Sequence, residues 1–308
     1  MHMTIFIIGH LCIDQVIIQG KKQPISMGGT AAFSSMLCSR LAPSEQVAVV
    51  SKIGPDYPDN FLETLRNARV DTTHVSRVKE RTTRYILEYS DSDERQLTLK
   101  SVCAPITIED LADKLDDAKL CYFGPIANEI PVGTIIEAKK RTNALIALDV
   151  QGIIRHKDAQ GHLSFKTSAK IEEMLPYVDI IKCDLGEAQT LAGASKIRDI
   201  FTYLSSLGVQ TVIITRGRAG SVIKVPGGVV IKVPPVLLQK IYNTTGAGDC
   251  YFGAFLIHYL ENQDPLLAAQ YATKVVSYFI GNPEGIQSFF VEGDINAIIE
   301  DFLEKNRA

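Results

Sequence analysis

Residues 243–249 read Asn-Thr-Thr-Gly-Ala-Gly-Asp and are followed by the apolar run Cys-Tyr-Phe-Gly-Ala-Phe-Leu-Ile at 250–257. The glycines allow close approach of the backbone to a ligand, and the apolar run predicts a buried helix. The amides of Gly246, Ala247 and Gly248 would then lie at a helix N-terminus, which favours an anion. Asp249 places a carboxylate beside that anion site. A phosphate held by amides next to a base is what phosphoryl transfer to a hydroxyl group requires, and Asp249 is the candidate for that general base.

The same stretch also fits a purely structural role. Thr244 would be a helix N-cap, the glycines a tight turn, and Asp249 an acid that complements the helix dipole. Two other phosphate-binding motifs are excluded. Tyr251 stands where the dinucleotide motif needs its third glycine, and the chain contains no Gly-x-x-x-x-Gly-Lys-Ser/Thr loop.

The length allows one large α/β domain, or a core domain with a small appendage, and the composition is that of a soluble globular protein. The chain has 308 residues, 46% of them hydrophobic, and a formal net charge of −3. This charge gives no electrostatic footprint for nucleic acid or an anionic membrane. No apolar run is long enough to span a bilayer and no signal peptide is apparent, so we expect a cytoplasmic protein. The six cysteines show no metal-binding spacing.

Strand and helix patterns alternate along most of the chain. Buried strands are predicted at 4–8, 48–52, 120–123, 145–149, 180–182 and 212–215, with a hairpin over 221–233. Helices are predicted at 30–41, 59–68, 108–115, 132–140, 197–207, 247–260, 265–279 and 293–304. This alternation predicts a mostly parallel sheet with helices on both faces.

Two β-rich segments, near 13–27 and 82–102, interrupt this pattern. We interpret them as one small sheet that projects from the core as a lid, with turns at 20–24 and 90–95. Such a lid would exclude water from a phosphoryl-transfer site. The alternative is that both segments are edge strands of the main sheet.

A second glycine-containing loop, Thr215-Arg216-Gly217-Arg218-Ala219-Gly220, follows a predicted strand. With the stretch at 243–249, it resembles the nucleotide loop and signature of the ribokinase-like (PfkB) carbohydrate kinases, although Asn243 replaces the Asp of that signature. The resemblance covers nearly the whole chain. It implies a single domain over 1–308, a three-layer ribokinase-like sandwich with a mostly parallel central sheet and a small β lid. It also implies ATP and Mg²⁺ as cofactors, and nucleotide binding by Thr215, Gly217 and Gly220.

The resemblance extends to an acceptor site near the N-terminus. Asp14 matches the family's substrate-binding acid, and Gly28-Gly29 matches its glycine pair. A carboxylate can accept hydrogen bonds from two sugar hydroxyls, and glycines let backbone amides approach the ring. Phe33 stands where the family often has an asparagine, which disfavours ribose itself.

The segment Asp184-Leu185-Gly186-Glu187 matches the family's Asn-x-x-Glu motif. Glu187 is the acid expected to organise Mg²⁺, through water, and Asp184 takes the nucleotide-contacting Asn position. Three features together resemble the inositol kinase branch of the family. They are the segment Cys183-Asp184-Leu185-Gly186-Glu187, Phe33, and the segment 148–155, Leu-Asp-Val-Gln-Gly-Ile-Ile-Arg. Gln151 and Arg155 would then reach a polyol, or else they belong to an ordinary loop after a strand.

The sequence thus predicts MgATP-dependent phosphorylation of a small sugar or polyol, with myo-inositol as the first candidate. Ribokinase, nucleoside kinase and keto-deoxy sugar acid kinase activities remain alternatives. A catalytically silent ligand-binding regulator on a kinase fold is the alternative of another class. The expected partners are the substrate and the nucleotide, without nucleic acid or membrane. An exposed lid edge predicts a homodimer through the lid.

Overall fold

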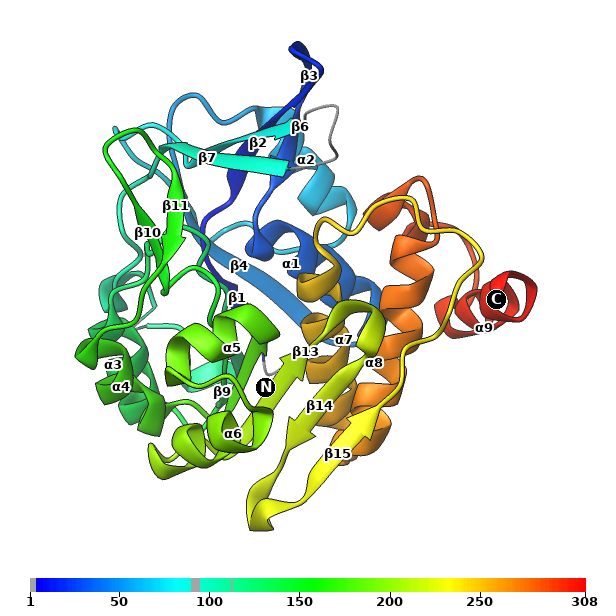
Figure 1. Cartoon of the computed structure of the whole chain (residues 1–308). Coiled ribbons are helices and arrows are strands. Elements are labelled where there is room, and N and C mark those ends of the chain that lie inside the picture. Colours follow the sequence, from blue (N-terminus) through cyan, green and yellow to red (C-terminus); the bar gives the residue numbers. More distant parts are fainter. Residues whose placement is uncertain (1–3, 90–94, 112) are drawn as a thin grey trace.

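The computed structural model describes residues 4–89, 95–111 and 113–308. At its centre lies a nine-stranded sheet in the order β15-β14-β13-β12-β9-β8-β1-β4-β5 (Figure 1). The strands are β1 (Thr4–Ile8), β4 (Gln46–Ile53), β5 (Val75–Arg77), β8 (Ala118–Phe123), β9 (Leu145–Asp149), β12 (Ile180–Asp184), β13 (Thr211–Thr215), β14 (Ser221–Lys224) and β15 (Val230–Val233). The strands from β5 to β13 run parallel, and only β14 and β15 pair antiparallel. The predicted mostly parallel sheet is confirmed.

Helices cover both faces of this sheet, so the molecule has three layers (Figure 1). One layer contains α1 (Thr30–Leu41), α2 (Asp59–Asn67), α7 (Ala247–Asn262), α8 (Pro265–Ile280) and α9 (Ile295–Asn306). The other contains α3 (Val132–Arg141), α4 (Ala169–Met174), α5 (Leu185–Ala192) and α6 (Ile197–Ser206). Strand β1 shows how the two cores arise. Ile5 and Ile7 pack into the first core, and Phe6 and Ile8 into the second, because successive side chains of a strand point to opposite faces.

One predicted helix is wrong. In place of a helix over 108–115 the structure has two single 3₁₀ turns, Ile108–Asp110 and Leu115–Asp117. Thr107 and Asp110 cap each other's backbone and close the first turn at once. The short helices α4 and α5 and a hairpin of β10 (Arg155–Lys157) and β11 (Leu163–Phe165) were not predicted.

The two β-rich segments form a separate four-stranded sheet, in the order β3-β2-β6-β7. Its strands are β2 (Cys12–Ile18), β3 (Lys21–Gly28), β6 (Arg84–Tyr89) and β7 (Arg95–Ser101). They are not edge strands of the main sheet. The predicted turn at 20–24 is shorter than expected: only Gln19 and Gly20 turn, both with positive φ, and Pro24 lies in β3. Proline is tolerated there because β3 is an edge strand. The predicted turn at 90–95 lies largely outside the described residues.

The small sheet lies over the carboxyl ends of the central parallel strands, the position at which open α/β sheets bind ligands. It enters between β1 and α1 and again between β5 and β8. The β10–β11 hairpin joins it, because the Leu99 amide donates to the Gly161 carbonyl at 2.9 Å. Figure 1 shows this sheet above the sandwich.

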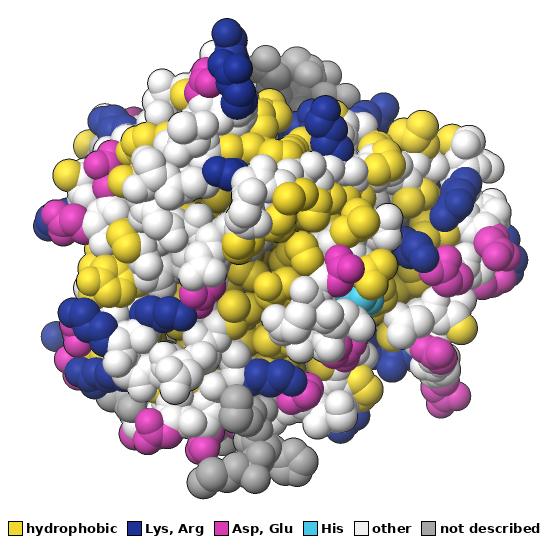
Figure 2. Space-filling model, turned by 90° about the horizontal axis from the view of Figure 1, so that it is seen from below, with side chains coloured by type: hydrophobic (Ala, Val, Ile, Leu, Met, Phe, Trp, Pro, Cys, Tyr) yellow, Lys and Arg dark blue, Asp and Glu magenta, His cyan; other side chains and the backbone are white. Residues whose placement is uncertain are grey.

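Charged side chains of both signs are interspersed on the face shown in Figure 2, around a hollowed apolar centre. This mixture agrees with the net charge of −3. Within the described part of the chain, no helix combines the length and apolarity needed to cross a membrane.

Candidate active site

The turn at 243–249 leads into α7, as the sequence predicted. Gly246 is the N-cap residue with φ of 83°, and no side chain caps this helix. The Asn243 side chain accepts a hydrogen bond from the Thr245 amide at 2.8 Å, so asparagine supplies an acceptor at this position. The Ala247 amide already donates to the Thr244 carbonyl at 3.1 Å. Of the three amides predicted to bind an anion, this one is therefore engaged within the turn.

Asp249 lies in the first turn of α7 and is only 9% exposed. Thr30, at the start of α1, donates its hydroxyl to Asp249 Oδ1 at 2.8 Å. Burial raises the pKa of Asp249 to about 6, and the nearby Asp149 carboxylate adds to this rise against the opposing effect of Lys182. The carboxyl group is therefore a stronger base than a free aspartate, yet mostly ionised at neutral pH.

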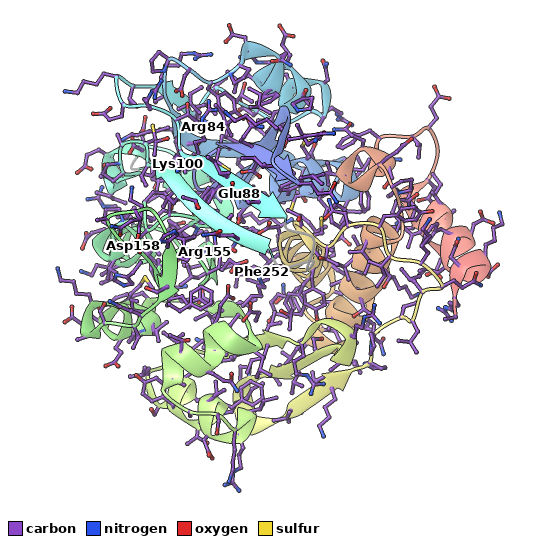
Figure 3. All side chains as sticks on the ribbon, turned by 45° about the horizontal axis from the view of Figure 1, so that its top comes forward. Arg84, Glu88, Lys100, Arg155, Asp158 and Phe252 are labelled. Atoms are coloured by element: carbon purple, nitrogen blue, oxygen red, sulfur yellow. The ribbon has the colours of Figure 1, made fainter. Side chains whose placement is uncertain are left out.

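A chain of side-chain hydrogen bonds leads from Asp249 to Arg155. Gln151 Nε2 donates to Thr30 Oγ1 at 3.0 Å, and Arg155 Nη2 donates to Gln151 Oε1 at 2.9 Å. Arg155 Nη1 also donates to the carbonyl of Ile126 at 3.3 Å. Figure 3 labels Arg155 close to the strands of the small sheet. These bonds fix the orientation of polar groups that the sequence assigned to the acceptor site.

Asp14 reaches the same region from β2, and Gly28 makes room for it. A Cβ atom on Gly28 would lie 2.2 Å from Asp14 Oδ2, so a side chain at position 28 would displace the Asp14 carboxylate. Gly29 has φ of 98°, and a Cβ on it would lie 2.5 Å from the His10 carbonyl oxygen. Both glycines of the pair are therefore explained by close packing around Asp14 and the start of α1.

These side chains line a cavity of about 190 Å³, the acceptor cavity. Six of the predicted site residues line it: Asp14, Gly29, Gln151, Arg155, Gly246 and Asp249. Gly28 does not line it. Residues that sequence reasoning did not assign to the site complete its wall: Cys12, Thr30, Phe33, Tyr85, Leu87, Leu97, Ile126, Thr244 and Thr245. The cavity is thus closed partly by the small sheet.

A second cavity, of about 540 Å³, lies on the other side of the turn and is called the donor cavity below. Five predicted residues line it: Thr215, Gly217, Gly220, Ala247 and Gly248. Its remaining wall is largely apolar and comes from α8 and the segment before the turn, including Val236, Leu237, Leu238, Ile241, Val276 and Ile280. The two cavities meet at Thr244, which lines both.

Asp184 and Glu187 line neither cavity and form a reciprocal helix cap at the start of α5. Asp184 Oδ1 accepts from the Glu187 amide at 2.8 Å, and Glu187 Oε2 accepts from the Asp184 amide at 2.7 Å. Burial raises the pKa of Glu187 to about 7, against the opposing charge of Lys182. Among the described residues, no cluster of three or more His, Cys, Asp or Glu side chains could hold a metal ion. One or two carboxylates fit only an ion such as Mg²⁺, which keeps waters and binds substrate phosphates.

Lys182 lies among three buried carboxyl groups, and the sequence did not single it out. Its Nζ is 2.8 Å from Asp149 Oδ2, and both side chains are almost fully buried. Although burial alone lowers the pKa of a lysine, the charges of Asp149, Glu187 and Asp249 raise the pKa of Lys182. A lysine inside the apolar run Ile180-Ile181-Lys182-Cys183 was the available signal, because a buried lysine needs a partner.

Comparison with protein families gives one match that covers almost the whole chain. The model of the pfkB family of carbohydrate kinases matches residues 4–289. Among curated proteins, a cytidine kinase of Thermococcus kodakarensis is 26% identical over 270 residues, which cover 83% of this chain and 88% of that protein. An inositol 3-kinase of Oryza sativa subsp. japonica is also 26% identical, over 81% of this chain and 61% of its own length.

Among solved structures, the chain is similar to a pyrophosphate-dependent kinase of the ribokinase family, which was determined with a pyrophosphate analogue and myo-inositol. The TM-score is 0.77 at 24% identity, and the match covers 92% of this chain and 99% of the other. At this identity the likeness establishes the fold. The names of these proteins give cytidine and inositol as acceptors and, for the solved structure, pyrophosphate as the phosphate donor.

Proposed function

The chain belongs to the pfkB family of carbohydrate kinases, and from this premise we propose that it transfers the γ-phosphoryl group of ATP to a hydroxyl of a small polyol or sugar. Members of this family are phosphotransferases. The observation that supports the proposal best is the position of Asp249, which lines the acceptor cavity and directly follows Gly248 in the wall of the larger donor cavity. A base between two ligand sites is what phosphoryl transfer to a hydroxyl requires.

In the acceptor cavity, Asp14 accepts hydrogen bonds from hydroxyls of the bound ring, and Gly29 lets the backbone come close to it. Arg155 and Gln151 supply further polar contacts. Asp249 takes the proton of the attacking hydroxyl late in the transfer, because a carboxylate with a pKa of about 6 is too weak to ionise an alcohol beforehand. Thr30 holds the carboxylate in the orientation that this step needs.

In the donor cavity, the apolar wall from α8 suits a nucleobase, and the Thr215–Gly220 loop suits the sugar and phosphates. The Gly246 and Gly248 backbone lies at the uncapped N-terminus of α7, where it stabilises charge on the transferring group. Glu187, with Asp184 beside it, would orient Mg²⁺ through water. When bound, Mg²⁺ neutralises charge on the phosphates.

We propose myo-inositol as the first acceptor to test. Polar groups from two different segments line the cavity, Asp14 from β2 and Gln151 with Arg155 from the segment after β9, which suits a ring that carries several hydroxyls. Phe33 in the wall removes the asparagine expected for ribose. These features support a polyol over ribose.

A nucleoside is the second candidate, favoured by one observation. The acceptor cavity adjoins a groove of about 1180 Å³ under the small sheet, which shares Asp14, Phe33 and Leu87 with it. The groove is lined by apolar side chains such as Val16 and Ile25. A sugar with an attached base would extend into this groove, whereas myo-inositol would not.

The test is a matrix of donors and acceptors. Purified enzyme is assayed with ATP or pyrophosphate as donor and with myo-inositol, ribose, fructose, cytidine, adenosine or a keto-deoxy sugar acid as acceptor. We expect turnover with ATP and myo-inositol, and none with pyrophosphate. Preference for cytidine would favour a nucleoside kinase over a polyol kinase. Binding of ATP and an acceptor without any product would favour the silent regulator.

We also propose that the small sheet acts as a lid and pairs two chains into a homodimer. Strand β3 is at the edge of that sheet, and Ile18 and Ile25 next to this edge are 47% and 39% exposed. An exposed strand edge with apolar neighbours favours pairing. Light scattering is expected to give the mass of a dimer, and a monomer mass at micromolar concentration would contradict it.

A further inference from the structure

Lys182 is a buried ammonium group that no predicted part of the site accounts for. It lies near the carboxyl end of β12 between Ile181 and Cys183, which are both fully buried. Its Nζ donates to Asp149 Oδ2 at 2.8 Å. A buried ion pair is weak evidence for a role in stability, since well-packed apolar residues of similar volume often serve at least as well. The charge itself therefore calls for an explanation.

The ammonium group of Lys182 lies directly against the turn that separates the two cavities. A Cβ atom on Gly248 would be 2.8 Å from Lys182 Nζ and 3.6 Å from Lys182 Cε. The space that a side chain at position 248 would fill is thus taken by the lysine. Lys182 lines neither the acceptor cavity nor the donor cavity. Any effect of Lys182 on a ligand in either cavity would therefore pass through the turn or through Asp249.

The charges around Asp249 come from several elements. The titratable groups that face it are Asp149, Lys182, Arg155, Tyr122, Cys12 and Cys250. Lys182 and Arg155 favour its ionised form, and Asp149 opposes it. In a buried site such effects are strong because water does not screen them. Lys182 is the fully buried cation of this set, and its partner Asp149 has the opposite effect on Asp249.

We propose that Lys182 is a positioning residue for phosphoryl transfer: held by Asp149 against the Gly248 backbone, its ammonium fixes the turn and keeps Asp249 ionised at neutral pH. The inference rests on the proposed function, in which Asp249 is the general base. It also assigns a role to Asp149. One oxygen of this carboxylate holds Lys182, and the other, Oδ1, accepts a hydrogen bond from the backbone amide of Gln151 at 3.2 Å.

The test is the pH dependence of kcat/KM between pH 5 and 9 for the wild type, Lys182→Met, Asp149→Asn and the double variant. We expect kcat/KM of the wild type to fall on the acid side of its pH profile, with the midpoint of this acid limb near pH 6. Loss of the lysine shifts this limb upward by about one pH unit or more, and loss of the aspartate shifts it downward. In the double variant the two shifts oppose each other, and the limb returns close to that of the wild type.

The matched control is Lys139→Met. Lys139 Nζ pairs with Asp179 Oδ2 at 2.6 Å, immediately before the other end of the same strand β12. Its loss also breaks a Lys–Asp pair, but far from the turn, so the acid limb is expected to stay in place. If Lys182→Met does not fold, Asp149→Asn and the double variant, which replaces the pair by neutral side chains, still test the proposal.

Coinciding acid limbs in all variants would overturn the inference and leave Lys182 as a structural residue. A raised KM for ATP with an unmoved limb would overturn it in favour of direct donor contact. A titration of the Asp249 carboxyl carbon by ¹³C NMR, assigned with Asp249→Asn, needs no turnover. If this titration shows the predicted shifts while no acceptor is phosphorylated, the proposed function fails and the role of Lys182 in the ionisation of Asp249 stands.

Discussion

The acceptor cavity and the donor cavity lie on either side of one turn, yet they are built differently. The acceptor cavity, about 190 Å³, has apolar side chains in its wall together with polar side chains that hydrogen bonds hold in place, such as Thr30, Gln151 and Arg155. The donor cavity, about 540 Å³, combines the glycine loop at 215–220 with an apolar wall from α8. One site is therefore defined by individual side chains, and the other by backbone shape and apolar surface.

This difference predicts that a substitution in one cavity affects the binding of the ligand in that cavity and leaves the other ligand unaffected. Changes in the acceptor cavity alter which hydroxyl compound reacts, while changes in the donor cavity alter ATP affinity alone. The segment 244–249 contributes to both cavities: Thr244 lines both, Gly246 and Asp249 line the first, and Ala247 and Gly248 line the second. Three substitutions, Asp249→Asn, Gly28→Ala and Val276→Trp, test that separation, and the last two have matched controls.

Asp249→Asn is expected to have the largest effect, because it removes the proposed general base. We expect kcat to fall by about 10²–10⁴-fold, the range typical of a lost general base. Binding of ATP and of the acceptor, measured by calorimetry, stays within a few-fold of the wild type. Turnover near the wild-type value would remove Asp249 from the mechanism.

Gly28→Ala tests the acceptor cavity alone. The new methyl group would lie 2.2 Å from Asp14 Oδ2 and displace that carboxylate. We expect kcat/KM for the acceptor to fall at least about 10²-fold, because misplaced positioning groups have costs of that order. The KM for ATP is expected to stay unchanged.

The matched control for that substitution is Gly133→Ala. Gly133 lies in α3, and a Cβ on it meets no atom within 4 Å, so activity is expected to stay at the wild-type value. Equal losses of acceptor and ATP affinity in Gly28→Ala would show that the two cavities are not separable.

Val276→Trp tests the donor cavity. Val276 lies in the apolar wall from α8, and a larger side chain there fills space assigned to the nucleobase. We expect the KM for ATP to rise about tenfold, equivalent to about 1.4 kcal/mol of lost binding, with the acceptor KM unchanged. The control is Val229→Trp on the β14–β15 turn, where the side chain is 58% exposed. An unchanged KM for ATP in Val276→Trp would place the nucleotide elsewhere.

The smallest effect is on stability, and its sign is opposite to the effect on activity. The pKa of Asp249 is about 6 in the folded protein and near 3.8 when unfolded, so the native state binds this proton more tightly. The contribution of this one carboxyl group to the free energy of unfolding therefore falls as the pH rises from about 4 to about 6. The Asp249→Asn variant has no carboxyl group to ionise at this position. Its free energy of unfolding is therefore expected to exceed that of the wild type by about 1–3 kcal/mol at pH 7.5, and to differ little from it at pH 4.

Urea titrations at the two pH values measure that difference. Glu187 has a raised pKa in both proteins, so its contribution largely cancels between them. A gap between variant and wild type that is the same at pH 4 and pH 7.5 would mean that burial of Asp249 does not disfavour its charged form.

The sequence predicted the sheet and most of its helices because the apolar runs are short, regular and punctuated by glycine. It also predicted the residues that a local motif carries, such as Asp249 and Gly217. Thr30 was missed because its contact with Asp249 joins residues 219 positions apart, and no local pattern reports such a contact. The apolar wall of the donor cavity was missed for a related reason. Val276 and Ile280 look like ordinary core residues of a helix until α8 is placed beside the glycine loop.

Lys182 shows where more could have been predicted. It ends one predicted strand and Asp149 ends another, and both strands are apolar. Two opposite charges at the ends of buried parallel strands predict an ion pair at the carboxyl edge of the sheet. The position of Gly248 against that ion pair could not be predicted, because it depends on how α7 docks onto the sheet.

The central claim is that the γ-phosphoryl group of ATP passes directly to a hydroxyl of the acceptor. The most direct test is ³¹P NMR of the wild-type enzyme with ATP and the acceptor that the assay matrix selects. We predict that ADP and a phosphomonoester of the acceptor appear in equal amounts, and that both are nearly absent with Asp249→Asn. Release of inorganic phosphate without a phosphomonoester, or an equal yield from Asp249→Asn, would contradict the account.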